Sequence, residues 1–449
     1  MREVHSLRIQ LSDHFTYRRL LRFVLPSIIM MVCISTYSIV DGLFVSNFVG
    51  KTSFAAVNLS MPLLTALGTI GFMIGTGGNA IVSRTMGEGK QEKANAYFTM
   101  LVIVAAVFGI FLALIGFIFA RPIMSALGAE GQMEDYCVIY VRILMISLPC
   151  YILQNIFQNF FIAAEKPEMS LKLSLASGLL NVVFDYVFIV LFDWGIAGAA
   201  AATAMGEILG GIVPVFYFAR ENDSRLRFTK TAFYGRILLK TCTNGSSELM
   251  TSISSSIVNM LYNFRLMGLT GEDGVAAYGV IMYVNFIFSA IFIGYSIGSA
   301  PVVSYHYGSG NHDELKNLFK KSLTLISITG LTLTALSELL SSVLIRVFVG
   351  YDAELMEMTV HGFRIYALFF LFCGFNIWGS AFFTALSNGL ISALISFSRT
   401  LVFQCSMVLF LPMILGIDGV WMAVIVAEIL ALVLTVTFLF AQRKTYKYI

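Results

Sequence analysis

The sequence predicts an all-α integral membrane protein in which twelve transmembrane helices form two pseudo-symmetric six-helix lobes. Three observations lead to this prediction: the composition, the length of the apolar runs and an internal repeat. Of the 449 residues, 58% are hydrophobic and 12% are charged, whereas soluble domains are about half apolar and about a quarter charged. The composition excludes a water-soluble enzyme. The formal net charge of +3 is too small to indicate nucleic-acid binding.

The apolar runs have the length of membrane-spanning helices. A helix needs about 20 residues to cross a hydrocarbon core of about 30 Å. The runs are separated by short polar breaks, and they are too long and too unalternated for the strands of a β-barrel. We expect twelve helices, at residues 23–48, 54–82, 95–119, 136–163, 170–192, 196–219, 238–266, 275–303, 318–345, 360–386, 390–415 and 418–441.

The basic residues predict the orientation, because positive charge resists translocation in short loops. Most of the 29 Lys and Arg residues lie in the N-terminal segment, in the even-numbered loops and at the C-terminus. We therefore expect a multi-pass protein of the inner (cytoplasmic) membrane with both termini in the cytoplasm. The basic, amphipathic residues 6–22 are expected to lie along the inner membrane surface.

An internal repeat divides the chain into two halves. A displacement of 221 residues brings Gly87 onto Gly308 and Glu207 onto Glu428, and in between, with one added residue, Arg142 onto Arg364. Each half holds an even number of spans, so the halves share one orientation and form parallel repeats. The predicted regions are a cytoplasmic segment (1–22), an N-lobe (23–219), a cytoplasmic linker (220–240), a C-lobe (241–441) and a cytoplasmic tail (442–449).

This architecture is typical of an alternating-access transporter, although duplication can also build a scaffold or a membrane enzyme. An enzyme would need catalytic side chains clustered at one membrane face. The histidines are instead scattered, at His5, His14, His306, His312 and His361. The six cysteines lie singly in or beside apolar stretches, so we interpret them as small hydrophobic residues and expect neither a metal site nor a cofactor.

Acids within the spans are candidates for function, because each costs roughly 2.5–3.5 kcal/mol at bilayer depth. At about 1.5 Å per residue, Asp41 and Asp185 lie at a similar depth in the outer half of the membrane. Asn181 is one turn from Asp185 on the same helix face, and Thr203 reaches a similar level. Two carboxylates, an amide and a hydroxyl suit either proton exchange or coordination of sodium.

The alternative interpretation is that these groups are polar links between helices or helix caps, which applies especially to Asp41 because Gly42 follows it. By the repeat, Asp41 corresponds to Tyr262, and Asp185 to Ser406 or Met407. The acid cluster is therefore expected in the N-lobe alone.

The other charges within the spans give weaker indications. Glu207 and Glu428 are related by the repeat and are either structural or acids of a cavity; we favour structure. Arg142 and Arg364 could neutralise them or cap the lobe interiors. Glu248 follows a polar run and could face a cytoplasmic cavity.

Aromatic and Met residues bear on the substrate. They could line an adaptable cavity for flat or cationic amphiphiles, although most such residues in a membrane bundle face lipid or pack. With Glu248, the candidates for such a cavity are Tyr37, Met61, Tyr262, Tyr278 and Met282.

Three motifs carry a resemblance to a known family. The first predicted helix has Pro26 and then Val40-Asp41-Gly42-Leu43-Phe44-Val45, the fifth has Asn181-x-x-x-Asp185, and the sixth has Gly195-Ile196-Ala197-Gly198-Ala199-Ala200 before Thr203. From about residue 15 to 441 the sequence resembles the multidrug and toxic compound extrusion (MATE) family, most closely its bacterial branch with the acids in the N-lobe.

The resemblance implies an antiporter that expels organic cations or drugs in exchange for protons or sodium. Asp41, Asn181, Asp185 and Thr203 would hold the coupling cation, and Pro26 would let the first helix bend. In the seventh helix the family often has Gly-Leu-Pro and a deeper acid. Here Gly245-Ser246-Ser247-Glu248 stands, so a cation site in the C-lobe cannot be carried over.

Flippases of lipid-linked oligosaccharides, in the same superfamily, are the alternative. They would need several cavity bases for a pyrophosphate, and the sequence offers Arg142, Arg364 and Arg399. In either case we expect small-molecule and membrane-lipid partners, no nucleic acid, and a monomer.

Overall fold

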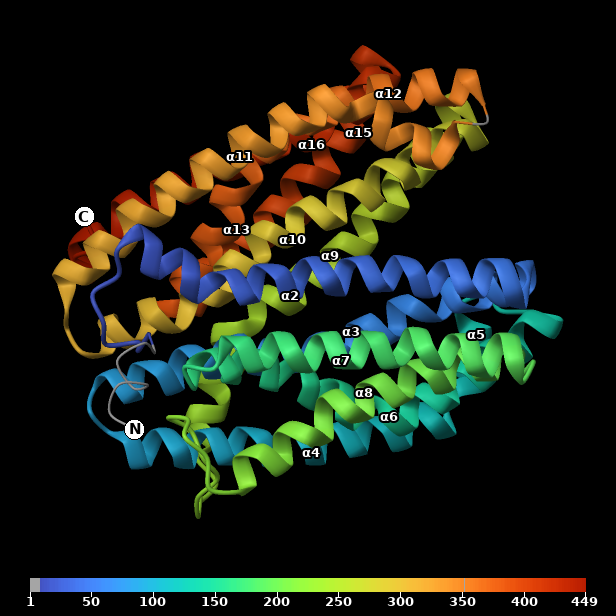
Figure 1. Cartoon of the computed structure of the whole chain (residues 1–449). Helices are drawn as coiled ribbons and strands as arrows, with labels where there is room; N and C mark the ends of the chain where they lie inside the picture. The colour runs from blue at the N-terminus through green and yellow to red at the C-terminus, as the bar shows by residue number, and fades with distance from the viewer. Residues whose placement is uncertain (1–8, 351) are drawn as a thin grey trace.

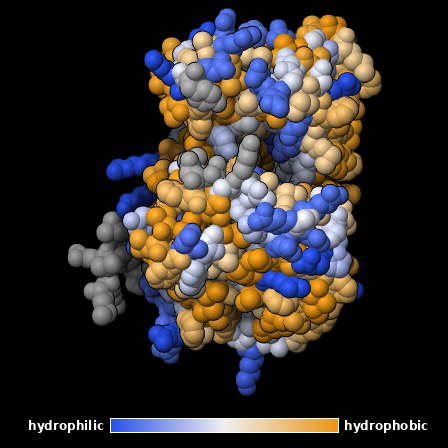
Figure 2. Space-filling model, turned by 90° about the vertical axis from the view of Figure 1, so that its right-hand side faces the viewer, coloured by the Kyte–Doolittle hydropathy of each residue, from blue (hydrophilic) through white to orange (hydrophobic). Residues whose placement is uncertain are grey.

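The chain folds into two helical bundles that meet at one end. The computed structural model describes residues 9–350 and 352–449, and it places no β-strand in them. Helices from the first half of the sequence form the first lobe, and helices from the second half form the second lobe (Figure 1). The lobes converge at the end where the described chain begins and ends, the terminal end, and diverge toward the opposite, open end. Figure 2 looks onto the open end and shows a hollow between the lobes.

The first lobe begins where the Thr16 side chain accepts a hydrogen bond from the Arg19 N–H and caps the first helix. Phenylalanines fill its core near the terminal end. The ring centroids of Phe98 and Phe160 are 4.9 Å apart, and those of Phe98 and Phe218 are 5.0 Å apart. The elements are α2 (Tyr17–Phe44), η1 (Val45–Val49), α3 (Lys51–Gly87), α4 (Gln91–Ile118), α5 (Ala120–Ala126), α6 (Gly131–Ala163), α7 (Pro167–Asp185), η2 (Tyr186–Leu191) and α8 (Gly195–Ala219).

The second lobe repeats this plan. Its elements are α9 (Gly235–Thr270), α10 (Glu272–Gly308), α11 (His312–Val349), α12 (Ala353–Ala367), α13 (Phe370–Ala385), α14 (Gly389–Phe397), η3 (Ser398–Gln404), α15 (Cys405–Leu415) and α16 (Ile417–Tyr446). The elements η1, η2 and η3 are π-helical continuations of the α-helices that precede them.

The prediction of twelve transmembrane helices in two lobes is confirmed. Among the described residues, ten helices are long and apolar enough to span a membrane on these criteria alone. An eleventh span is the pair α12 and α13, which bends by 50° at its break where the sequence predicts one segment at 360–386. The twelfth is α9, which is 36 residues long and packs within the bundle. Its hydropathy is low because it is rich in Ser, Thr and Asn.

The prediction for residues 6–22 is not what the structure shows. Residues 6–8 lie outside the described residues, and α2 begins only after residue 16. Leu11 and Phe15 are buried in the protein. The Leu11 N–H donates to Glu165 Oε1 at 2.8 Å, and the Phe15 N–H donates to Glu314 Oε1 at 2.9 Å. Glu165 of the first lobe and Glu314 of the second lobe thus bind this segment at the terminal end.

The lobes touch closely through two glycines at the terminal end. A Cβ atom on Gly308 of α10 would lie 2.8 Å from the carbonyl carbon of Arg84 on α3. In the reciprocal contact, a Cβ on Gly87 of α3 would lie 3.0 Å from the carbonyl carbon of Tyr305 on α10. Because Gly87 and Gly308 are related by the repeat, the contact is pseudo-symmetric. It brings the two backbones together as no larger residue would allow.

Candidate functional site

The structure brings together the four residues that the sequence places at one depth. Asp41 on α2 is a neighbour of both Asn181 and Asp185 on α7. Asn181 Nδ2 donates a hydrogen bond of 3.4 Å to Thr203 Oγ1 on α8. Asp185 is completely buried, and Asn181 is 5% exposed. Three helices of the first lobe therefore present two carboxylates, an amide and a hydroxyl to one another.

Most oxygens of this cluster lack a hydrogen-bond donor. Asp41 Oδ1, Asn181 Oδ1 and both carboxylate oxygens of Asp185 are buried and have no hydrogen-bond partner in the part of the chain that the structure describes. A buried polar group without a partner is costly, and a buried charge more so. Either a proton on a carboxyl group or a small cation bound by these oxygens offsets that cost, since small hard cations prefer oxygen ligands.

The described residues contain no group of three or more His, Cys, Asp or Glu side chains placed to hold a metal ion. The cluster has two carboxylates, and its other oxygens come from Asn181 and Thr203. This donor set fits a proton or a monovalent cation better than a divalent metal, whose charge would call for more carboxylates.

The backbone around the acids departs from regular α-helix. Asp185 is the last residue of α7 and is followed at once by the π-turn η2, and α2 passes into the π-turn η1 just after Asp41. The two π-turns contact each other. Such turns are rare, and they occur frequently at functional sites. They could not be predicted from the sequence, because neither segment contains a proline or a helix-breaking glycine.

Two tyrosines border the cluster. The Tyr37 ring packs so closely on Gly178 of α7 that a Cβ there would lie 2.7 Å from its Cδ1 atom. Tyr140 of α6 is buried near both Asp41 and Asp185. Tyr37 is one of the predicted cavity residues and lies close to the acid cluster. Tyr140 was not predicted, because an aromatic residue within a span carries no signal of its own.

Glu207 and Glu428 have different partners, although the repeat relates them. Ser147 Oγ donates to Glu207 Oε2 at 2.5 Å. Glu428 is paired with Arg399 at 2.7 Å and accepts a hydrogen bond of 2.7 Å from Asn376 Nδ2. The second acid is thus neutralised by a base within its lobe.

The arginines predicted to neutralise these acids lie elsewhere. The guanidinium of Arg142 lies 5.5 Å from the centroid of the Phe117 ring, and Arg364 Nε donates to Ser341 Oγ at 3.1 Å. Of the two alternatives for Arg142 and Arg364, the one in which they neutralise Glu207 and Glu428 is therefore wrong, whereas the capping of the lobe interiors stays a prediction. The repeat shows which residues are equivalent, but it does not show which residues touch.

The other predicted cavity residues do not gather at one surface. Tyr262 and Tyr278 stack face to face in the second lobe, with centroids 4.7 Å apart, and both are buried. Met61 is exposed on α3, whereas Met282 and Glu248 are half-buried on α10 and α9. In this conformation Tyr262 is part of the core of the second lobe and does not face an open cavity.

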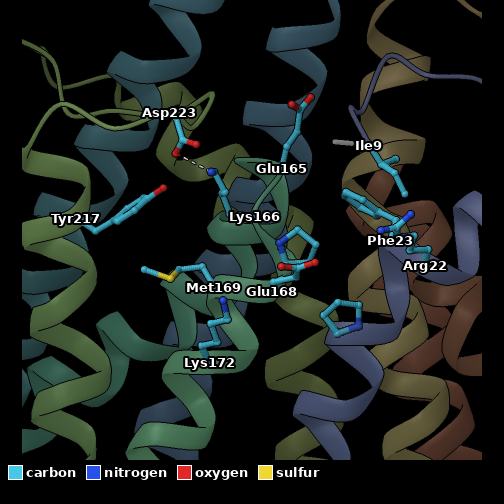
Figure 3. A pocket seen from close by; sticks show the side chains of 12 residues that line it. Ile9, Arg22, Phe23, Glu165, Lys166, Glu168, Met169, Lys172, Tyr217 and Asp223 are labelled. Carbon is cyan, nitrogen blue, oxygen red and sulfur yellow. Dashed lines mark hydrogen bonds and ion pairs between the residues drawn. The ribbon is translucent and has the colours of Figure 1, made fainter. Parts of the chain in front are cut away.

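A separate cavity of about 320 Å³ opens at the terminal end of the first lobe. Its walls are the beginning of α2, including Pro26, the connection from α6 to α7, and the end of α8. Figure 3 shows Lys166 and Asp223 facing each other there, with Nζ and Oδ1 2.6 Å apart. Glu165 lies on the opposite side of Lys166, and burial raises the pKa of its carboxyl. Pro26 is within the continuous helix α2.

The chain is similar to known proteins over most of its length. The family model described as MatE matches residues 26–187 and 249–409. The chain is 24% identical over 370 residues to the multidrug export protein MepA of Staphylococcus saprophyticus, a match that covers 80% of each protein.

Solved structures have the same fold. One is described as the outward-facing conformation of a multidrug resistance MATE family transporter of the MOP superfamily. It has a TM-score of 0.91 and 21% identity, and the match covers all of this chain and 99% of that one. A structure of MATE in the straight conformation has a TM-score of 0.91 and 20% identity, over 97% and 98% of the two chains.

Proposed function

This chain belongs to the MATE family of membrane transporters, and from this premise we propose that it is a secondary active antiporter. It exports organic cations, drugs among them, in exchange for protons or sodium ions by alternating access. Relatives such as MepA are multidrug export proteins, which supports drugs as the substrate class. The observation that carries the exchange is the set of buried, unpartnered oxygens on Asp41, Asn181 and Asp185.

The coupling cation binds between Asp41 and Asp185. When the site is empty, the two carboxylates repel each other, and a proton or a sodium ion removes that repulsion. Asp41 belongs to α2, which packs against α7 of its own lobe and against α10 of the other lobe. A movement of α2 therefore changes its contacts with α10 at the interface between the lobes. Pro26 lacks an N–H group and gives α2 a position at which to bend.

We place the protein in the inner membrane as a monomer, with the terminal end and both termini in the cytoplasm. The open end then faces outward, where the exported drug is released. Residues 23–219 and 241–441 are the two moving lobes, and residues 220–240 link them. A flippase of lipid-linked oligosaccharides is less well supported. Its pyrophosphate would need free bases, yet Arg142, Arg364 and Arg399 are engaged at three separate places.

Efflux of ethidium from proteoliposomes tests this function. Proton and sodium gradients are imposed separately, and the gradient that drives efflux identifies the coupling ion. Asp41→Asn and Asp185→Asn should abolish gradient-driven efflux, because each removes one charge of the pair with little change in shape. Glu338→Gln alters another acid within the membrane, in the second lobe, and should leave efflux unchanged. Wild-type efflux in both aspartate variants would refute the assigned site.

A further inference from the structure

The buried face of α7 is polar along nearly the whole helix. Apart from Pro167 and Gly178, the buried residues of α7 are Ser170, Ser174, Ser177, Asn181 and Asp185. Spacings of three and four residues place them on one side of the helix. At about 1.5 Å per residue this face is roughly 22 Å long. It begins at the acid cluster and ends beside Met169 and Lys172, which line the cavity at the terminal end.

Two glutamines of α6 face this row of hydroxyl groups. Gln154 Nε2 donates to Ser177 Oγ, and Gln158 Nε2 donates to Ser174 Oγ, each at 3.3 Å. Gln158 is 6% exposed, and its Oε1 atom is buried without a hydrogen-bond partner among residues 9–350 and 352–449. Gln158 Oε1 therefore needs a hydrogen-bond donor, and the described residues do not provide one.

A small cavity lies at this place. It has a volume of about 10 Å³, and its walls include Gln154, Gln158, Ser170 and Ser174. That volume is about the minimum that holds one water molecule. A water molecule here can donate a hydrogen bond to Gln158 Oε1 and can bond to the hydroxyl groups of Ser170 and Ser174, so it would link these two serines.

The equivalent face of the second lobe is closed by direct contacts. With the displacement of 222 residues that relates Arg142 to Arg364, Gln158, Ser170 and Ser174 correspond to Ser380, Ser392 and Ser396. The Ser380 hydroxyl lies 2.8 Å from the hydroxyls of both Ser392 and Ser396. Ser177 corresponds to Arg399, which is bound to Glu428. In the first lobe Ser177 Oγ donates to the Gly206 carbonyl oxygen, and Ser170 Oγ donates to the Gln158 carbonyl oxygen at 3.1 Å. The difference between the lobes is therefore Gln158 Oε1, which stays without a partner among the described residues.

We propose that this polar face of α7, together with Gln158, is the path by which the coupling proton leaves the Asp41–Asp185 pair for the cavity at the terminal end. The proposal rests on the proposed function and commits it to protons. The O–H bond of the carboxyl group breaks, and an adjacent water or hydroxyl oxygen forms a new O–H bond with the proton while giving up its own proton to the next water or hydroxyl. Each relay step thus forms one O–H bond and breaks one, and the amides of Asn181 and Gln158 only hold these groups by hydrogen bonds. The carboxylate stays behind, and the proton reaches water in the cavity. Space for one water conducts a proton but does not admit a hydrated sodium ion.

Efflux of ethidium at saturating concentration, driven by a proton gradient in proteoliposomes of the full chain, tests the path. Gln158→Leu and Ser174→Ala should each lower the maximal rate roughly five- to tenfold, the effect of one lost hydrogen bond on a rate. The ethidium concentration at half-maximal rate should stay the same. The rate ratio between H₂O and D₂O should rise, because proton movement becomes limiting; a purely structural role would not change that ratio.

Ser396→Ala is the matched control, since Ser396 is the repeat partner of Ser174 and lies far from the acid pair. It should leave the rate and the isotope ratio unchanged. Thermal unfolding shows whether each variant folds, and Ser174→Ala decides the matter if Gln158→Leu does not. A wild-type rate and isotope ratio in the folded variants would overturn the path, as would equal losses in Ser396→Ala or efflux driven by sodium alone. Failure of the proposed function itself would instead appear as wild-type efflux in Asp41→Asn and Asp185→Asn.

Discussion

The variant Gly308→Ala should weaken one of the close contacts that hold the lobes together at the terminal end. The added Cβ would lie 2.8 Å from the carbonyl carbon and 3.0 Å from the Cα of Arg84. Carbon atoms pack at about 3.5–4.0 Å, so α3 and α10 must separate by roughly 1 Å. Overpacking of this kind costs about 1–3 kcal/mol. A bias of that size changes the ratio between two conformations by about 5- to 150-fold.

Double electron–electron resonance in lipid nanodiscs measures this change. Spin labels at Glu92 and Asp313 report on it, because both residues are exposed near the terminal end and are related by the repeat. Gly308→Ala should increase the population with the longer distance. Gly279→Ala is the control, since a Cβ on this glycine of the same helix meets nothing within 4 Å. An unchanged distance distribution in a folded Gly308→Ala protein would refute the idea that this contact keeps the terminal end closed.

Two further predictions concern buried charges. Arg399→Met should lower the free energy of unfolding by about 3–5 kcal/mol, because it leaves Glu428 buried without its cation. Thermal unfolding in detergent measures this loss, and the double variant with Glu428→Leu should recover most of it; no recovery would contradict the explanation. Glu314→Ala should speed amide hydrogen exchange in residues 11–16, because Phe15 N–H loses its acceptor at a cost of about 1–3 kcal/mol. Asp313→Ala, next to it and exposed, should leave exchange unchanged, and equal exchange in both variants would contradict the anchoring role.

The sequence predicts the helices well, because a long apolar run in a bilayer must form a helix to satisfy its backbone hydrogen bonds. It does not predict the 50° bend between α12 and α13. The residues at that break are Leu368 and Phe369, and neither is a helix breaker, so the bend follows from tertiary packing. Nor does it predict that Leu11 and Phe15 are buried, since their acceptors, Glu165 and Glu314, are far away in sequence.

The common depth of Asp41 and Asp185 could be predicted from the sequence, whereas their proximity also needs α2 to pack against α7. Depth says nothing about the direction in which a side chain points around its helix. In this conformation Tyr262 is buried in the second lobe, where it stacks on Tyr278, and its grouping with Tyr37 into one substrate cavity stays a prediction. Rotation about the helix axis is set by packing, which a single sequence with apolar residues on all faces does not reveal.

The repeat supports the proposal that cation exchange belongs to one lobe. Both lobes keep an acid at the equivalent positions Glu207 and Glu428, and both keep a polar face beside it. In the second lobe the position of Ser177 is taken by Arg399, and this fixed base neutralises Glu428 permanently. A buried acid paired with a base inside its lobe has no need of a mobile cation. In the first lobe that position is a neutral serine, and no ion pair neutralises the aspartate pair among residues 9–350 and 352–449. On the proposed function, a cation that comes and goes offsets its charge, which is the physical requirement of an antiporter.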